Sequence, residues 1–283
     1  MLEGADMKQV IIALLLSFGA AMVPSACTAE LNTIMMEATC KIVGPGSIGT
    51  GFVMAKPGTN GPRAFYVLIT ADHVLQGIQG ETATLVLRQS APSNSWNRIE
   101  FPVRIRTGAT PLWKKHPDVD VAAMFIGVPP NTVERPVSTT LLVDDDMLKK
   151  YQFHPGMELL CLGYPFGAEA NPYGFAILRS GRIASYPLTP TKATKTFLFD
   201  FTVFRGNSGG PVYFVQPNPM VGDVQYNMTL LQGVIGIVIQ ERSITQTTQE
   251  LYEKRETTTP LRLAEVVHAS FVKELVESMG FPK

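Results

Sequence analysis

Short apolar segments alternate with clusters of glycine, proline, asparagine and threonine over most of the chain. The apolar segments are rich in valine, isoleucine, leucine and phenylalanine, and this pattern predicts β-strands that are bounded by turns. The predicted strands are Ala38–Val43, Gly49–Lys56, Ala64–Thr70, Thr82–Arg88, Ile99–Thr107, Val119–Ile126, Glu158–Gly163, Ala176–Ala184, Thr196–Phe201, Pro211–Val215 and Leu230–Gln240. Short strands at such regular spacing are typical of an all-β protein, built as a barrel or a sandwich.

A connector rich in proline and threonine, PPNTVERPVSTT at residues 129–140, divides the strands into two sets. The division predicts two six-stranded antiparallel β-barrels with the active site in the cleft between them. We expect the N-terminal barrel over residues 30–140 and the C-terminal barrel over residues 141–245. A polar linker and a C-terminal helix are expected over residues 246–283.

The expected helix follows Pro260, in the segment LRLAEVVHASFVKELVESMG. Its apolar residues recur at helical spacing and form a stripe, namely Leu263, Val266, Val267, Phe271 and Leu275. Pro260 suits the first turn of a helix and Gly280 suits its end. His268 would then be a surface or packed residue of this helix.

The N-terminal segment does not resemble folded protein. An apolar, charge-free run, VIIALLLSFGAAMV, extends from Val10 to Val23 and is shorter than the roughly 20 residues of a membrane span. Lys8 precedes this run, and the small residues of PSACTAE follow it. These features predict a signal peptide or lipoprotein leader over residues 1–29, with an uncleaved N-terminal anchor as the alternative. The protein is therefore expected to be exported, as a periplasmic, secreted or lipid-anchored protein.

The chain has three cysteines, and each raises a different question. Cys27 follows the apolar run directly, as in a bacterial lipoprotein cleavage site, so it either carries a lipid anchor or is removed with the leader. Cys40 and Cys161 could form a disulfide in an oxidising compartment, or they could be two unrelated buried thiols. No spacing of cysteines and histidines indicates a metal site.

The charge balance excludes some partners. The chain has 24 lysines and arginines and 24 aspartates and glutamates, so its formal net charge is zero. A protein that binds nucleic acid or an anionic membrane over a broad surface would carry a basic excess. We therefore expect no nucleic-acid partner, and contact with a membrane only through a lipid at Cys27.

The segment FRGNSGGPVY, residues 204–213, places Ser208 among three glycines. Such a segment is either a simple turn or the exposed loop of a nucleophile, and a nucleophilic serine needs a base. His73 is the best candidate among the histidines, because it follows an apolar strand in YVLITADHVLQG. His116 and His154 both lie in proline-containing loops.

A histidine base is usually oriented by a carboxylate. Asp120 leads directly into the apolar strand VAAMFI, where a buried charge would need a partner, and we expect that partner to be His73. Asp118 is expected to be a solvated loop residue. The resulting order of histidine, aspartate and serine along the chain is the order found in chymotrypsin.

With these residues in place, the chain resembles trypsin/chymotrypsin-fold serine peptidases of the bacterial HtrA-like kind, without an evident PDZ domain. The resemblance covers roughly residues 37–245 and is carried by GTGFVMA at 49–55, TADHVL at 70–75, DVAAMFI at 120–126, GYPFG at 163–167, GNSGGPV at 206–212 and GVIGIVI at 233–239. It implies two β-barrels, hydrolysis of peptide bonds in a protein or peptide substrate, and no cofactor.

The resemblance also implies roles for individual residues. His73 would be the base, Asp120 the orienting carboxylate and Ser208 the nucleophile. The oxyanion hole would be formed by the loop Gly206, Asn207 and Ser208. The substrate pocket would be formed near Thr202, Gln240 and Glu241, and without an aspartate at its base it would favour a small or apolar side chain.

Three functions are compatible with these residues. The first is an exported serine endopeptidase, which the complete set of His73, Asp120 and Ser208 favours. The second is a catalytically silent trypsin-fold module that binds a peptide or protein. The third is a serine hydrolase that acts on esters.

Overall fold

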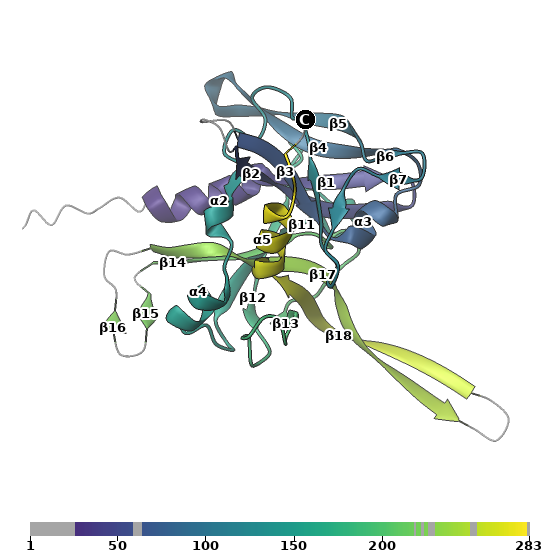
Figure 1. Ribbon diagram of the computed structural model, residues 1–283, viewed down its shortest axis with the longest axis vertical. Coiled ribbons are helices and arrows are strands. Elements are labelled where there is room, and N and C mark those ends of the chain that lie inside the picture. The colour runs from purple at the N-terminus through teal and green to yellow at the C-terminus, as the bar shows by residue number, and fades with distance from the viewer. Residues whose placement is uncertain are drawn as a thin grey trace, which may run out of the picture.

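The computed structural model describes residues 26–58, 64–217, 219–221, 224–225, 230–249 and 254–281 (Figure 1). Two β-sheet assemblies make up most of this part of the chain. One hydrophobic core lies within the C-terminal barrel, and the other connects the N-terminal sheet to the helices and to barrel residues such as Leu162 and Val234. Residues 1–25 of the predicted leader, with the run from Val10 to Val23, lie outside the described residues. Residues 26–29, with Cys27, form the start of helix α2 (Ala26–Ala38), which the strand pattern does not predict. No helix in the described part is long and apolar enough to cross a membrane.

The N-terminal assembly is an open sheet of eight strands. Its strands are β1 (Thr39–Gly44), β2 (Ser47–Pro57), β3 (Ala64–Thr70), β4 (Thr82–Ala91), β5 (Ser95–Arg104), β8 (Lys114–Lys115), β9 (Ala122–Phe125) and β10 (Val137–Ser138). The order is β5-β4-β1-β2-β3-β9-β8, with β10 parallel to β2. The prediction of a closed six-stranded barrel is therefore wrong for this half. The edge strands β5 and β8 do not pair, and β8 is only two residues long.

The C-terminal assembly is a closed barrel of six strands, as predicted. Around the barrel the order is β11 (Glu158–Gly163), β12 (Ile177–Ile183), β13 (Thr196–Asp200), β18 (Lys254–His268), β17 (Leu230–Gln249) and β14 (Pro211–Pro217). Aromatic and β-branched side chains fill its core, among them Phe197, Phe199, Phe214 and Val266. Each strand of a closed barrel pairs on both sides, so no strand edge is left free within it.

The predicted helix after Pro260 is wrong in its first half. Residues Lys254–His268 form strand β18, and helix α5 covers only Ala269–Glu277. The stripe of apolar residues fits a helix, but β18 gains a ladder on both sides, with β13 and β17. Such pairing of β-branched residues overrides local helical periodicity. His268 is the last residue of β18 and is buried rather than at the surface.

The segment predicted as a polar linker from residue 246 belongs to a long hairpin. Strands β17 and β18 continue beyond the barrel and project far from the body of the molecule (Figure 1). Among the described residues, the strands of this projecting part pair with each other alone, from Ser243 with Pro260 to Gln249 with Lys254.

Buried cations attach two helices to the N-terminal sheet. Lys56 of β2 donates to the carbonyl oxygens of Val276 (2.6 Å) and Met279 (2.5 Å), at the C-terminal end of α5. Arg88 of β4 donates to the carbonyl of Met36, near the end of helix α2 (Ala26–Ala38). A cation at a helix C-terminus is favoured by the helix dipole and by the unpaired carbonyls there.

The remaining elements are short. They are α3 (Asp72–Gln76), α4 (Asp145–Lys150), the 3-10 turns η1 (Pro92–Asn94), η2 (Thr139–Leu141) and η3 (Pro165–Gly167), and the strand pairs β6 (Arg106–Thr107) with β7 (Thr110–Pro111) and β15 (Met220–Val221) with β16 (Val224–Gln225).

Cys40 and Cys161 are both buried and free, so they do not form a disulfide. Burial raises the pKa of each thiol to about 12, which keeps both protonated.

Candidate active site

His73 lies in the first turn of α3, directly after strand β3 of the N-terminal sheet. The neighbouring Asp72 is buried and accepts a hydrogen bond of 2.7 Å from the indole N–H of Trp113. Thr70, the last residue of β3, donates to the carbonyl oxygen of Thr50 in β2 at 2.7 Å. The backbone on which His73 is mounted is therefore anchored on both sides.

Asp120 lies just before β9 and contacts His73 with both carboxylate oxygens. Its Oδ2 is 2.5 Å from His73 Nδ1, and its Oδ1 accepts the backbone N–H of His73 at 3.0 Å. Partial burial acts to raise the pKa of Asp120. The hydrogen bonds from the His73 ring and backbone outweigh this effect, so the pKa lies below its usual range.

This contact determines which nitrogen of His73 is available. A carboxylate against Nδ1 holds the proton on that atom, so Nε2 of the neutral ring is left as an acceptor. The His73 side chain is 49% exposed, which leaves its free nitrogen accessible from the cleft. A histidine held in this tautomer is suited to accept a proton from a hydroxyl group.

The other predicted candidates lie elsewhere. His116 is buried against Phe271 of α5, and its Nδ1 accepts the backbone N–H of Asp118. His154 contacts the carbonyl of Pro155 at 2.8 Å, in a loop of the C-terminal half. Neither histidine lines the cleft that contains Ser208.

The Ser208 loop is held from both assemblies. Within the barrel, Gly209 N–H donates to the carbonyl of Val238 at 2.7 Å. From the N-terminal sheet, Thr50 N–H donates to the carbonyl of Ser208 (2.8 Å), and Thr50 Oγ1 donates to the carbonyl of Gly206 (2.6 Å). Thr50 therefore connects the sheet that carries His73 to the loop that carries Ser208.

Two glycines of the loop have no room for a side chain. Gly206 has a φ of +102°, and a Cβ on it would lie 2.1 Å from the carbonyl oxygen of Tyr164. Gly209 has a φ of +84°, and its Cβ would lie 2.1 Å from the carbonyl oxygen of Thr50. Only glycine combines this backbone conformation with such close approach.

The backbone donors of the loop divide into two groups. The N–H groups of Gly206 and Ser208 have no hydrogen-bond partner within the part of the chain that the structure describes. The N–H of Asn207 donates to the carbonyl of Phe204 at 2.9 Å. Gly206 and Ser208 therefore keep backbone donors of the kind that an oxyanion needs, whereas the backbone donor of Asn207 is already used within the loop.

The orientation of the Gly206 N–H is fixed by its peptide neighbour. The carbonyl oxygen of Arg205 accepts the backbone N–H of Phe166 at 2.6 Å. In a trans peptide the carbonyl oxygen and the following N–H point in opposite directions. The bond to Phe166 therefore keeps the Arg205 oxygen from taking the position of the Gly206 N–H.

The Ser208 hydroxyl does not bond to His73 in this structure. Its Oγ donates to the carbonyl oxygen of Ile239 at 3.0 Å. Both residues nevertheless line one cleft of about 410 Å³, which is lined by His73, Asp120, Val203, Phe204, Arg205, Ser208, Ile239, Gln240 and Glu241. The structure thus brings the three predicted catalytic side chains to one cavity, with the serine hydroxyl turned toward its own barrel.

The predicted pocket residues are only partly found there. Gln240 and Glu241 line the cleft, but Thr202 does not, and the carbonyl of Thr202 accepts a hydrogen bond from Arg179. Val203 and Phe204 line the cleft instead. Sequence reasoning missed them because a position counted back from Ser208 does not show which side chains of an irregular loop face inward.

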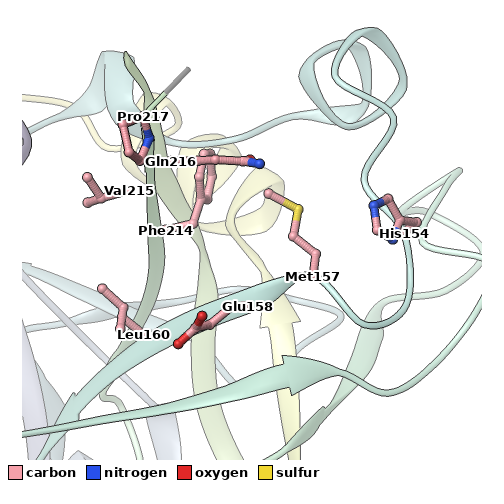
Figure 2. A pocket seen from close by; sticks show the side chains of 8 residues that line it. All are labelled: His154, Met157, Glu158, Leu160, Phe214, Val215, Gln216 and Pro217. Carbon is pink, nitrogen blue, oxygen red and sulfur yellow. The ribbon is translucent and has the colours of Figure 1, made fainter. Parts of the chain in front are cut away.

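A second cavity of about 460 Å³ lies beside strands β11 and β14 of the C-terminal barrel (Figure 2). It is lined by His154, Met157, Glu158, Leu160, Phe214, Val215, Gln216 and Pro217. In Figure 2 the Met157 side chain lies between His154 and the β14 residues Phe214 and Gln216. The lining contains no serine or cysteine, so this cavity holds no counterpart of Ser208. Among the described residues, no three histidine, cysteine or acidic side chains are grouped as metal ligands.

No protein-family model and no curated protein matches the chain. Among solved structures, the chain is similar to Rv3671c from M. tuberculosis. The inactive form of its serine-to-alanine mutant shares 17% identity at a TM-score of 0.45, over 92% of this chain and 96% of that chain. The inactive form of Rv3671c protease shares 16% identity at a TM-score of 0.43, over 91% and 96%. This likeness is distant, so the chemistry is inferred from the side chains of this chain.

Proposed function

We propose that the protein is an exported serine endopeptidase in which His73, Asp120 and Ser208 form the catalytic triad. The observation that carries this proposal is the His73–Asp120 contact at the edge of a cleft that Ser208 also lines. A serine hydroxyl is unreactive at neutral pH unless a base removes its proton, and the free Nε2 of His73 is such a base.

The reaction would begin with a rotation of the Ser208 side chain from the Ile239 carbonyl toward His73. This step exchanges one hydrogen bond for another, and catalytic hydrogen bonds often tighten only when substrate is bound. Ser208 Oγ would then attack the carbonyl carbon of the scissile peptide bond while its proton passes to Nε2 of His73. The protonated His73 would later deliver this proton to the leaving amine.

Asp120 would stabilise the positive charge that His73 carries during these steps. Its pKa is held low by the bonds to His73, so it remains a carboxylate and does not take the proton itself. The negative charge on the substrate oxygen would be met by the N–H groups of Gly206 and Ser208. Removal of one such donor typically costs about 10²–10³ in kcat.

A covalent acyl-enzyme on Ser208 would then be hydrolysed by water, with His73 as the base for the second time. The substrate is proposed to be a protein or peptide, because the cleft is open and is bordered by the strand residues Ile239, Gln240 and Glu241. A strand edge can pair with the backbone of an extended peptide.

Export is proposed from the leader-like run Val10–Val23. It can be tested by fractionation of producing cells and mass spectrometry of the mature N-terminus. A mature chain that begins near Cys27, with or without a lipid, is the expected result. Full-length protein in the cytosol would contradict the proposal.

The alternative function is a catalytically silent module that binds a peptide or protein. The bond from Ser208 Oγ to Ile239 favours this alternative, since a serine that never turns toward His73 would not react. The two functions are separated by incubating the full chain with an unfolded protein such as reduced casein. The endopeptidase cleaves it and loses this activity on Ser208→Ala, whereas the silent module binds it without cleavage.

A further inference from the structure

The projecting part of the hairpin, Ser243–Gln249 of β17 and Lys254–Pro260 of β18, is called the arm here. All side chains that the structure describes in it, residues 243–247 and 256–260, are exposed. Strand β14 pairs with β17 only up to Ile237, and β13 pairs with β18 only from Ala264 onward. Within the described residues, both edges of the arm therefore lack a neighbouring strand.

Polar side chains lie on both faces of the arm, and Ile244 is its one large hydrophobic side chain among the residues that the structure describes. Thr245 lies opposite Thr258, with the two Oγ1 atoms 3.0 Å apart, and Gln246 lies opposite Thr257. An isolated two-stranded ribbon is marginally stable in water, and its open edges readily pair with another strand. Threonine-rich strands with exposed edges are thus suited to accept a third strand through backbone hydrogen bonds.

One edge of the arm continues from the candidate active site. Strand β17 carries Ile239, Gln240 and Glu241, which line the cleft with Ser208. A register shift between Arg242 and Ser243 separates this part of β17 from the arm without interrupting the strand. A peptide that leaves the cleft along this edge would therefore meet the arm next.

We propose that the arm is an exosite that binds an extended segment of the polypeptide substrate as an added β-strand. This inference rests on the proposed function, and it adds a binding surface beyond the cleft. Antiparallel pairing is the commoner arrangement, and it would place on the arm the substrate residues that precede the scissile bond. At about 3.4 Å per residue, Ser243–Gln249 offers about 24 Å of edge.

The test compares the full chain with an arm-shortened variant, in which Thr245–Thr258 is replaced by an Asn-Gly turn. This two-residue turn suits the retained pair of Ile244 and Thr259, because both residues have the backbone N–H that closes such a turn, whereas Pro260 has none. Cleavage sites are first located in a reduced and alkylated protein by mass spectrometry. Peptides around one site are then made with about 4 or about 12 residues before the scissile bond, so that only the longer one spans the arm.

The arm-shortened variant should cleave the short peptide as well as the unchanged chain does. For the long peptide its kcat/KM should fall by about tenfold, through KM rather than kcat, because the lost contacts are the same in the ground and transition states. A matched variant, Thr245→Val with Thr247→Val, keeps the backbone edge and should retain the preference for the long peptide.

Several results would overturn the exosite. One is an equal kcat/KM of the arm-shortened variant and the full chain for the long peptide. An equal loss for both peptides would show that the arm supports the cleft instead. A dimer that disappears on shortening, with the length preference unchanged, would identify a second copy of the chain as the occupant.

A binding measurement distinguishes a failure of this inference from a failure of the proposed function, because it does not require the enzyme to be active. The fluorescence anisotropy of a labelled, reduced and alkylated protein is measured with Ser208→Ala, with and without the shortened arm. About tenfold weaker binding of the shortened form supports the exosite whether or not the enzyme is active. Equal binding of the two forms contradicts it, even if Ser208 proves to be reactive.

Discussion

The two halves of the candidate site differ in how their reactive groups are bonded. In the N-terminal half, the His73 ring is bonded to Asp120, and the backbone N–H of His73 is bonded to the same carboxylate. In the C-terminal half, the N–H groups of Gly206 and Ser208 have no partner among the described residues. One half thus holds a hydrogen-bonded pair of histidine and aspartate, and the other holds open backbone donors. This difference is what a reaction that creates an oxyanion between them requires.

The comparison also shows what connects the halves. Thr50 bonds to the carbonyls of Gly206 and Ser208, while its own carbonyl accepts the hydroxyl of Thr70, close to His73. The Ser208 hydroxyl itself stays on the barrel side, bonded to Ile239. The two halves are therefore connected through Thr50 rather than through His73 and Ser208. In the proposed mechanism, these two side chains would come into contact only when a substrate is bound.

The largest effect is expected from Ser208→Ala, which removes the hydroxyl that we propose as the nucleophile. Activity against reduced casein should fall by at least about 10⁴-fold, the usual scale for loss of a nucleophile. Circular dichroism and the unfolding midpoint should stay close to those of the unchanged chain. Residual cleavage within tenfold of the unchanged chain would place the nucleophile elsewhere.

Asp120→Asn tests the N-terminal half. The amide cannot hold His73 in the required tautomer, so kcat should fall by about 10⁴-fold. The matched control is Asp118→Asn, because Asp118 is exposed and its backbone N–H, not its side chain, bonds to His116. Equal effects of the two substitutions, measured with the same peptide, would contradict the role of Asp120.

Gly206→Ala tests the open donors of the C-terminal half. The added Cβ would collide with the Tyr164 carbonyl and strain a residue with positive φ, so the Gly206 N–H would be displaced. We expect kcat to fall by about 10²–10³-fold. Gly127→Ala is the control, since a Cβ there has no atom within 4 Å. An unchanged kcat of a folded Gly206→Ala protein would rule out this oxyanion hole.

Thr50→Val tests the connection between the halves. It removes the hydroxyl that bonds the Gly206 carbonyl but keeps the size and β-preference of the side chain. The free energy of unfolding should fall by about 1–3 kcal/mol, because the buried Gly206 carbonyl loses its partner. The value of kcat should fall as well. Thr50→Ser should restore most of both quantities, and its failure to do so would show that the methyl group rather than the bond is important.

The smallest effect concerns the dependence of stability on pH. The pKa of Asp120 is lower in the folded chain than in the unfolded chain, so its bonds to His73 stabilise the fold above the unfolded value of about 3.9. This contribution is lost as the pH falls through the lowered folded pKa. The difference in unfolding free energy between the unchanged chain and Asp120→Asn should therefore shrink toward acidic pH. A difference that is constant with pH would contradict the pairing.

Much of the fold could be predicted because strand patterning is local. The strands around the site, such as Ala64–Thr70 and Glu158–Gly163, lie where the alternation of apolar runs and turns placed them. The spacing of His73, Asp120 and Ser208 also pointed to one cleft. These predictions depend on residue types that have few other reasons to occur together.

The parts that could not be predicted depend on pairing between distant segments. The apolar stripe from Leu263 to Leu275 fits a helix, and only the positions of β13 and β17 show that its first half is a strand. The openness of the N-terminal sheet depends likewise on edge strands that do not meet. The sequence of the arm predicts a polar linker because polar residues lie on both of its faces, so it lacks the alternation that marks a half-buried strand.

The most direct measurement is reaction of the purified full chain with a fluorophosphonate probe, followed by mass spectrometry to locate the adduct. The account predicts one adduct, on Ser208, that is lost in Ser208→Ala and strongly reduced in His73→Ala. An unlabelled but folded chain, or an adduct on another serine, would contradict the central claim that His73 activates Ser208.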